Sequence, residues 1–149
     1  MHSSRLVLFI LLLIWISGIF VNLIIPDSVV FNPVISSFYS NVCHQNHLKS
    51  FQFSGMYLPV CARCTGIYIG AFAFSIISLF YLFNTNSLKL LFISSIPLII
   101  DVIFYNIGIY SYNPIISFLT GLFFGSVVFI YILNSLELFF KEKKLLRYE

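Results

Sequence analysis

The most restrictive feature of this sequence is a stretch from Leu6 to Ile25 that contains no charged side chain. A helix needs about 20 predominantly apolar residues to cross the hydrocarbon core of a membrane, and this stretch supplies them. Pro26 and Asp27 follow at once and end the apolar run. A cleaved signal peptide has a shorter apolar region and a small-residue cleavage site after it, and this segment has neither. We therefore expect a membrane-spanning helix here.

Three further stretches support the same assignment, at about residues 66–83, 88–110 and 114–140. Of the 149 residues, 60% are hydrophobic and 9% are charged, whereas an ordinary soluble domain has about 25% charged residues. The chain is therefore expected to be a single all-α membrane domain over residues 1–149. Its predicted architecture is a four-helix bundle with one long extracytoplasmic Cys/His loop, about residues 26–65, between spans one and two.

The distribution of lysine and arginine predicts the orientation of the bundle. With four spans, both termini and the joint near Lys89 lie on one face, which carries six basic residues against two on the other. The six are Arg5, Lys89, Lys141, Lys143, Lys144 and Arg147, and the two are Lys49 and Arg63. Because cytoplasmic segments are enriched in basic residues, we expect a multi-pass protein of the cell membrane with both termini in the cytoplasm.

The expected partner is the lipid bilayer. The net charge is only +3, and the basic residues that cluster in the carboxyl-terminal tail are interspersed with glutamates, so nothing indicates a nucleic acid. A homo-oligomer or a larger membrane complex stays open, because spans two and four begin alike, with TGIYIG at 65–70 and TGLFFG at 120–125. Small residues four apart lie on one helix face and let a neighbouring backbone approach closely. One hypothesis is therefore a non-catalytic scaffold subunit that packs through these faces.

All three cysteines and two of the three histidines lie within residues 43–64. Pro59 suits the first position of a helix, in which Cys61 and Cys64 would share one face. Unpaired backbone N–H groups at a helix start, the helix dipole and the nearby Arg63 all favour thiolate over thiol. Thiolate is the form of cysteine that binds metals and attacks disulfides.

A metal site is the leading hypothesis for this loop. A closed tetrahedral zinc site takes four sulfur or nitrogen ligands, and Cys43, Cys61 and Cys64 with one histidine supply them. The histidine is His47 if residues 43–47 form a helical turn, and His44 if the segment is extended. Zinc is the default metal because it prefers this ligand set, although copper or iron binds the same soft ligands.

A membrane thiol–disulfide oxidoreductase is the alternative. Cysteines outside the cell are prone to oxidation, and a Cys-x-x-Cys at a helix start is the arrangement that such enzymes use. Cys61 and Cys64 would then form the disulfide, and Cys43 would be the exchanging thiol. The residues do not decide whether the protein is an enzyme, and they name no substrate.

Asp101 is the one carboxylate deep inside a predicted span. Nine residues separate it from Tyr110, which places it about 13 Å below the outer end of span three. Ionisable residues inside a membrane usually face the bundle interior and carry function. Asp101 is therefore a candidate metal ligand, a proton carrier or an ion-pair partner for Arg63.

The segments CHQ at 43–45 and LPVCARCTGIYIG at 58–70 carry a resemblance to a known family. The chain resembles small prokaryotic integral membrane proteins that are known as a domain of unknown function. The likeness covers about residues 40–130 and includes Asp101 and the late Thr120-Gly121 with Gly125. It implies His44 rather than His47 as the ligand, and it implies no activity.

Three positions depart from the family pattern. Lys49 occupies a position where the family pattern looks like arginine, and Leu48 occupies one where an acidic residue is common. Ile116 or a neighbour occupies the position where a second arginine often precedes the late Thr-Gly. If those arginines grip an anion in the family, this chain is expected to grip it less well, because arginine binds anions bidentately.

Overall fold

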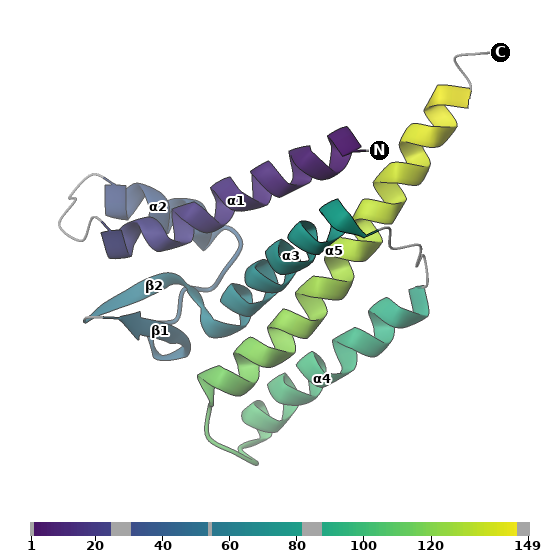
Figure 1. Ribbon diagram of the computed structural model, residues 1–149. Coiled ribbons are helices and arrows are strands. Elements are labelled where there is room, and N and C mark those ends of the chain that lie inside the picture. The colour runs from purple at the N-terminus through teal and green to yellow at the C-terminus, as the bar shows by residue number, and fades with distance from the viewer. Residues whose placement is uncertain (1, 25–30, 54, 82–87, 146–149) are drawn as a thin grey trace.

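The computed structural model describes residues 2–24, 31–53, 55–81 and 88–145 (Figure 1). The elements in chain order are α1 (His2–Ile24), α2 (Phe31–Ser40), a 3-10 turn (His47–Lys49), β1 (Ser50–Phe53), β2 (Met56–Cys61), α3 (Ala62–Phe80), α4 (Leu88–Ile107) and α5 (Pro114–Leu145). Among these described residues, four helices are long and apolar enough to cross a membrane, with candidate spans Ser4–Val21, Ala62–Phe80, Leu88–Ile107 and Pro114–Glu142. The predicted all-α membrane architecture is confirmed, and a small two-stranded sheet is added to it.

The bundle is built around α3 and α5, which lie side by side over most of the length of α3 (Figure 1). Helix α1 packs against α3, and α4 packs against α5. Only 11% of the residues in each of the α1 and α4 spans are buried by the protein, so much of their apolar surface faces outwards, where a bilayer would cover it. The amino end of α1 and the carboxyl end of α5 lie at the same end of the bundle, and the sheet lies at the other end (Figure 1).

The two Thr-Gly motifs explain why α3 and α5 approach so closely. A Cβ added to Gly66 or Gly70 would meet the carbonyl oxygens of Phe118 or Leu122 on α5. A Cβ on Gly121 or Gly125 would meet backbone oxygens of α3 in the same way. The packing role predicted for these glycines is thus found within the chain. A scaffold would need another surface, since these faces are already occupied.

The connection between the first two spans is more regular than a polar loop. It contains α2, the 3-10 turn and an antiparallel hairpin in which Gln52 pairs with Tyr57 and Phe53 with Met56. Gly55 in the hairpin turn has a φ of +85°, a conformation that costs glycine little. The structure adds these elements to the Cys/His loop predicted over residues 26–65, of which 26–30 and 54 lie outside the described residues.

The prediction that Pro59 begins a helix is wrong. Pro59 lies in β2 and not in the first turn of a helix. A two-stranded sheet has only edge strands, where the missing N–H of proline can face away from the partner strand. Helix α3 instead begins at Ala62, four residues before the predicted start of span two. Cys61 therefore occupies the N-cap position of α3 without a side-chain capping hydrogen bond, and Cys64 lies in the first turn.

Candidate functional site

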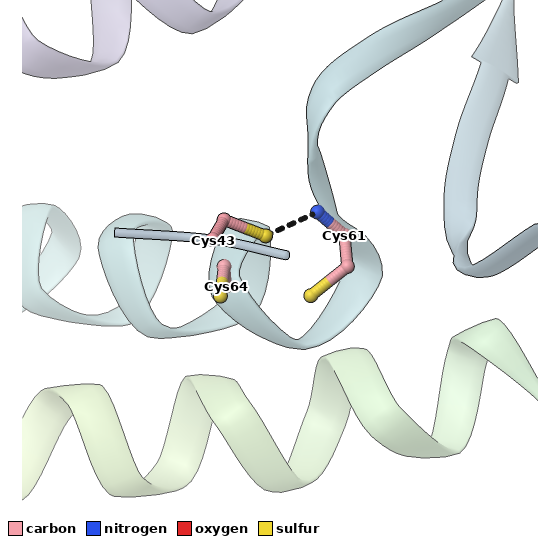
Figure 2. A group of neighbouring side chains, drawn as sticks. All are labelled: Cys43, Cys61 and Cys64. Carbon is pink, nitrogen blue, oxygen red and sulfur yellow. Dashed lines mark hydrogen bonds between the residues drawn. The ribbon is translucent and has the colours of Figure 1, made fainter. Parts of the chain in front are cut away.

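The three cysteines form one group at the end of the bundle that carries the sheet. Their sulfur atoms all lie within 4.8 Å of one another (Figure 2). Cys43 comes from the segment after α2 and is buried, whereas Cys61 at the end of β2 and Cys64 in α3 are partly exposed. The fold thus brings a distant cysteine onto the Cys-x-x-Cys pair.

Hydrogen bonds converge on the sulfur of Cys43. The backbone N–H of Cys61 donates to it over 3.2 Å (Figure 2). Hydrogen bonds from the side chains of Cys61 and then Cys64 lower the pKa of Cys43 far below its ordinary value, whereas the bond to Cys43 raises the pKa of Cys61. Donors that point at a sulfur stabilise its anionic form. This arrangement therefore favours the thiolate form at Cys43.

Gln45 shapes the chain around Cys43. Its φ of +46° lies in the left-handed region, which costs a residue with a side chain on the order of 1 kcal/mol. Its amide compensates by a double contact with Ser36 on α2: Gln45 Nε2 donates to the Ser36 carbonyl oxygen over 2.6 Å, and Ser36 Oγ donates to Gln45 Oε1 over 3.1 Å. The turn that presents the Cys43 sulfur is thereby fixed to α2.

A small apolar core supports the cysteine group from the side of α1. It contains the buried side chains of Ile19, Tyr39, Cys43, Leu58 and Val60. Cys61, Cys64 and Trp15 pack against this core as partly buried neighbours. The sulfur atoms therefore lie on a packed surface rather than in a free loop.

The two histidines of the loop lie outside the sulfur group. Within the described residues, the cluster of potential ligand atoms consists of the three cysteines alone. His44 is exposed directly beside Cys43, and His47 is exposed in the 3-10 turn, where its ring lies 5.3 Å from that of Tyr57. Ligation by His44 would require its ring to turn toward the sulfur atoms, so its role as a fourth ligand stays a prediction.

Asp101 is buried at the same end of the bundle and connects three elements. Arg63 Nη2 on α3 and Ser117 Oγ on α5 donate to Asp101 Oδ2 over 2.6 and 2.9 Å. Tyr110, beyond the end of α4, donates its hydroxyl to Oδ1. This bond raises the pKa of Tyr110 to about 12, so the phenol keeps its proton as a donor at neutral pH. The cysteine motif is therefore linked to α4 and α5 through Arg63.

Replacing Arg63 by methionine is expected to destabilise the fold by about 3 kcal/mol, because a buried carboxylate then loses its counter-charge. The side chain of Asp101 is 2% exposed and that of Arg63 is 25% exposed. Asp101→Leu should therefore cost less, since an unpaired Arg63 can reach water. Denaturant unfolding in detergent micelles measures both variants.

The double variant Arg63→Met/Asp101→Leu is the control for this ion pair. It should recover a large part of the loss, because neither charge is then left alone. Strictly additive losses would show that the two side chains do not depend on each other, and would contradict the pairing.

Lys49 ties the hairpin to the neighbouring helices. Its Nζ lies 4.2 Å from the centre of the Tyr105 ring, and its backbone oxygen accepts a hydrogen bond from the Tyr112 hydroxyl over 3.0 Å. Phe51 on β1 and Phe118 on α5 add a ring contact at 5.7 Å. The hairpin is thus docked over the ends of α4 and α5.

Sequence reasoning did not assign roles to three side chains that shape this region, Gln45, Tyr110 and Ser117, and it considered Lys49 only as a possible anion contact and not as a link between the hairpin and the helix ends. The role of Gln45 could have been predicted, since it follows Cys43-His44 directly and the glutamine side chain has both a donor and an acceptor for a backbone group. The role of Ser117 was harder to predict, because a serine inside a span usually donates a hydrogen bond to a carbonyl oxygen of its own helix. The positions of Tyr110 and Lys49 depend on how the helix ends meet.

The comparisons with known proteins agree with this architecture. The family model described as "Predicted membrane protein (DUF2085)" matches residues 43–131. An uncharacterised protein of Methanothermobacter thermautotrophicus is 40% identical over 85 residues, which are 54% of this chain and 75% of the relative. An uncharacterised protein of Methanocaldococcus jannaschii is 35% identical over 111 residues, 71% of each chain. No solved structure gives a significant match. The chain therefore belongs to the DUF2085 family of membrane proteins.

Proposed function

We propose that the chain is a metal-binding membrane protein in which Cys43, Cys61 and Cys64 hold a zinc ion, with His44 as the fourth ligand. The observation that carries the proposal is the mutual distance of the three sulfur atoms, at most 4.8 Å. Zinc–sulfur bonds of about 2.3 Å in a tetrahedron place sulfur atoms about 3.8 Å apart. A small contraction of the group would reach that geometry.

The surroundings of the sulfurs support an anionic ligand set. Cys43 already accepts a backbone N–H, which is a bond that favours thiolate. The buried Asp101 is neutralised by Arg63, so the carboxylate needs no metal for charge balance. Bound zinc would join the segment after α2 to the start of α3. Cross-linking two segments in this way is typical of a closed structural zinc site. The same soft ligands would also bind copper or iron.

Cobalt substitution tests the ligand set directly. Co²⁺ bound to thiolates gives charge-transfer absorption that grows with the number of sulfur ligands. Cys43→Ser, Cys61→Ser and Cys64→Ser should each reduce this absorption and weaken zinc binding by at least about tenfold, or about 1.4 kcal/mol. Zinc at about 100 times its dissociation constant should stabilise the wild-type protein by about 2.7 kcal/mol.

His44→Ala and His47→Ala form a matched pair, because both histidines are exposed in the same cap. His44→Ala should weaken zinc binding about tenfold, and His47→Ala should leave it unchanged. Equal behaviour of the two variants would remove His44 from the ligand set. Cobalt spectra that do not change in any cysteine variant would overturn the metal site as a whole.

A thiol–disulfide oxidoreductase is the second candidate function, and the proximity of a third cysteine to the Cys-x-x-Cys pair favours it. In that case Cys61 and Cys64 would form a disulfide, and the Cys43 thiolate would be positioned to exchange with it. Such a protein would show a pair of thiols that reappears on reduction, with no bound metal.

The membrane and its sidedness complete the proposal. We place the cysteine end on the outside of the cell membrane and both termini in the cytoplasm. The excess of lysine and arginine at the opposite end supports this orientation. Arg5, one of the counted residues, is buried, so the argument rests mainly on the carboxyl-terminal lysines.

A further inference from the structure

Helix α2 runs back along α1 instead of leaving the bundle (Figure 1). The Tyr39 hydroxyl donates to the carbonyl oxygen of Trp15 over 2.5 Å, and the two rings lie 5.2 Å apart. Gly18 leaves the space that the Tyr39 ring occupies. Trp15 lies within the candidate span of α1, six residues before its end at Val21. Six residues of helix rise about 9 Å, so the hydroxyl end of the Tyr39 side chain reaches about that far below the end of the span.

The side chains of α2 divide between two faces. Ile35 and Tyr39 belong to the apolar core beside the cysteines. Val34 and Phe38, four residues apart on another face, are 62% and 60% exposed. The Phe38 ring lies 5.6 Å from that of Trp15, so this exposed face continues the surface of α1.

We propose that α2 is embedded in the lipid leaflet at the cysteine end, with Val34 and Phe38 against acyl chains. At the depth of Trp15, apolar side chains that the protein leaves uncovered meet lipid rather than water. The segment from Phe31 to Cys43 has no charged residue. Two exposed polar side chains at the end of this segment are satisfied locally, since Ser40 and Asn41 both donate to carbonyl oxygens of α2.

The surface of α1 identifies lipid as the partner. Ile14, next to Trp15, is 61% exposed in a helix that spans the membrane. The α2 face continues this lipid-facing surface without an intervening charge. The chain accordingly has a fifth membrane segment that enters and leaves on the same side, and this holds whether or not the cysteines bind a metal.

The single tryptophan of the chain allows a fluorescence test. Trp15→Phe/Phe38→Trp carries one tryptophan on the exposed face of α2. In liposomes, phospholipids brominated on the acyl chains should quench the fluorescence of this tryptophan. The extent of quenching should lie within about twofold of that of a Trp15→Phe/Ile14→Trp reporter on α1. Aqueous iodide should quench the Phe38→Trp reporter poorly.

Trp15→Phe/Leu48→Trp is the matched control, because Leu48 is 88% exposed in the 3-10 turn of the same cap. Iodide should quench this reporter, and brominated lipid should not. A Phe38→Trp reporter that behaves like the Leu48→Trp reporter would overturn the proposal.

A second reporter keeps Trp15, whose loss removes packing from the core. A photoactivatable benzophenone amino acid at Val34 should form adducts with phospholipid, detectable by mass spectrometry of the intact protein. The same group at Leu48 should form none. Lipid adducts at Leu48 but not at Val34 would place α2 outside the bilayer and contradict the proposal.

Discussion

Gly121→Leu is expected to destabilise the bundle by about 3 kcal/mol or more. The new side chain would meet the carbonyl oxygen of Arg63, which belongs to the backbone of α3 and cannot move alone. Helices α3 and α5 would have to separate along their whole contact, which forms the centre of the bundle. Gly125→Leu should act similarly, because its Cβ would meet the backbone oxygen of Ile67.

Phe123→Leu is the matched control for the glycine variants, since Phe123 lies between the two glycines and is 48% exposed. Unfolding in detergent micelles, followed by circular dichroism, should change by less than about 0.5 kcal/mol for this substitution. A Gly121→Leu protein as stable as this control would mean that α3 and α5 are farther apart than the structure has them.

Glu137→Leu is expected to cost about 3–5 kcal/mol, because it leaves Arg5 as a buried charge without a partner. Arg5 Nε donates to Glu137 Oε1 over 2.7 Å, and Arg5 Nη1 donates to the Ser78 carbonyl oxygen over 2.7 Å. The two side chains are only 3% and 10% exposed. This contact joins α1, α3 and α5 at the end of the bundle opposite the cysteines.

The variant Arg5→Met/Glu137→Leu separates the ion pair from simple packing. It should be markedly more stable than Glu137→Leu alone, since it removes both charges. Glu142→Gln, at an exposed position five residues farther along α5, should be close to neutral in the same unfolding assay. Equal losses in Glu137→Leu and Glu142→Gln would contradict a buried ion pair.

The four spans and the close-packing role of the glycines could be predicted because each depends on local sequence. Apolar length alone identifies a spanning helix, and small residues four apart mark a close-packing face. The approach of Cys43 to Cys61 and Cys64 was also predictable as a shared ligand set. The sequence pattern could not show that the glycine faces of α3 and α5 meet each other, since that depends on the order of helices in the bundle.

Other parts of the fold could not be predicted from local patterns. Helix α2 contains Pro33 and several serines and is too short to span a membrane, so its sequence was consistent with a loop. Pro59 indicated a helix start where the chain forms a short strand. The pair of Arg5 and Glu137 joins residues at opposite ends of the chain, and each had a simpler interpretation as a charge at a membrane surface.

The candidate site was predictable in its residue types and less so in its geometry. The cysteines meet because the hairpin returns the chain to the start of α3, next to the turn that Gln45 fixes. The spacing of His44 and His47 cannot reveal the direction of their side chains, which depends on the φ and ψ angles of the turn. Either histidine is near the sulfurs in sequence, and neither ring joins the described sulfur group.

The most direct test of the central claim is elemental analysis of the protein purified in detergent, with free thiols counted on the same sample. The metal-site account predicts about one zinc per chain, lost in Cys61→Ser, and three thiols that become reactive when the metal is chelated. A protein without metal, in which two of the three thiols are unreactive until a reductant is added, would contradict it and support the disulfide instead.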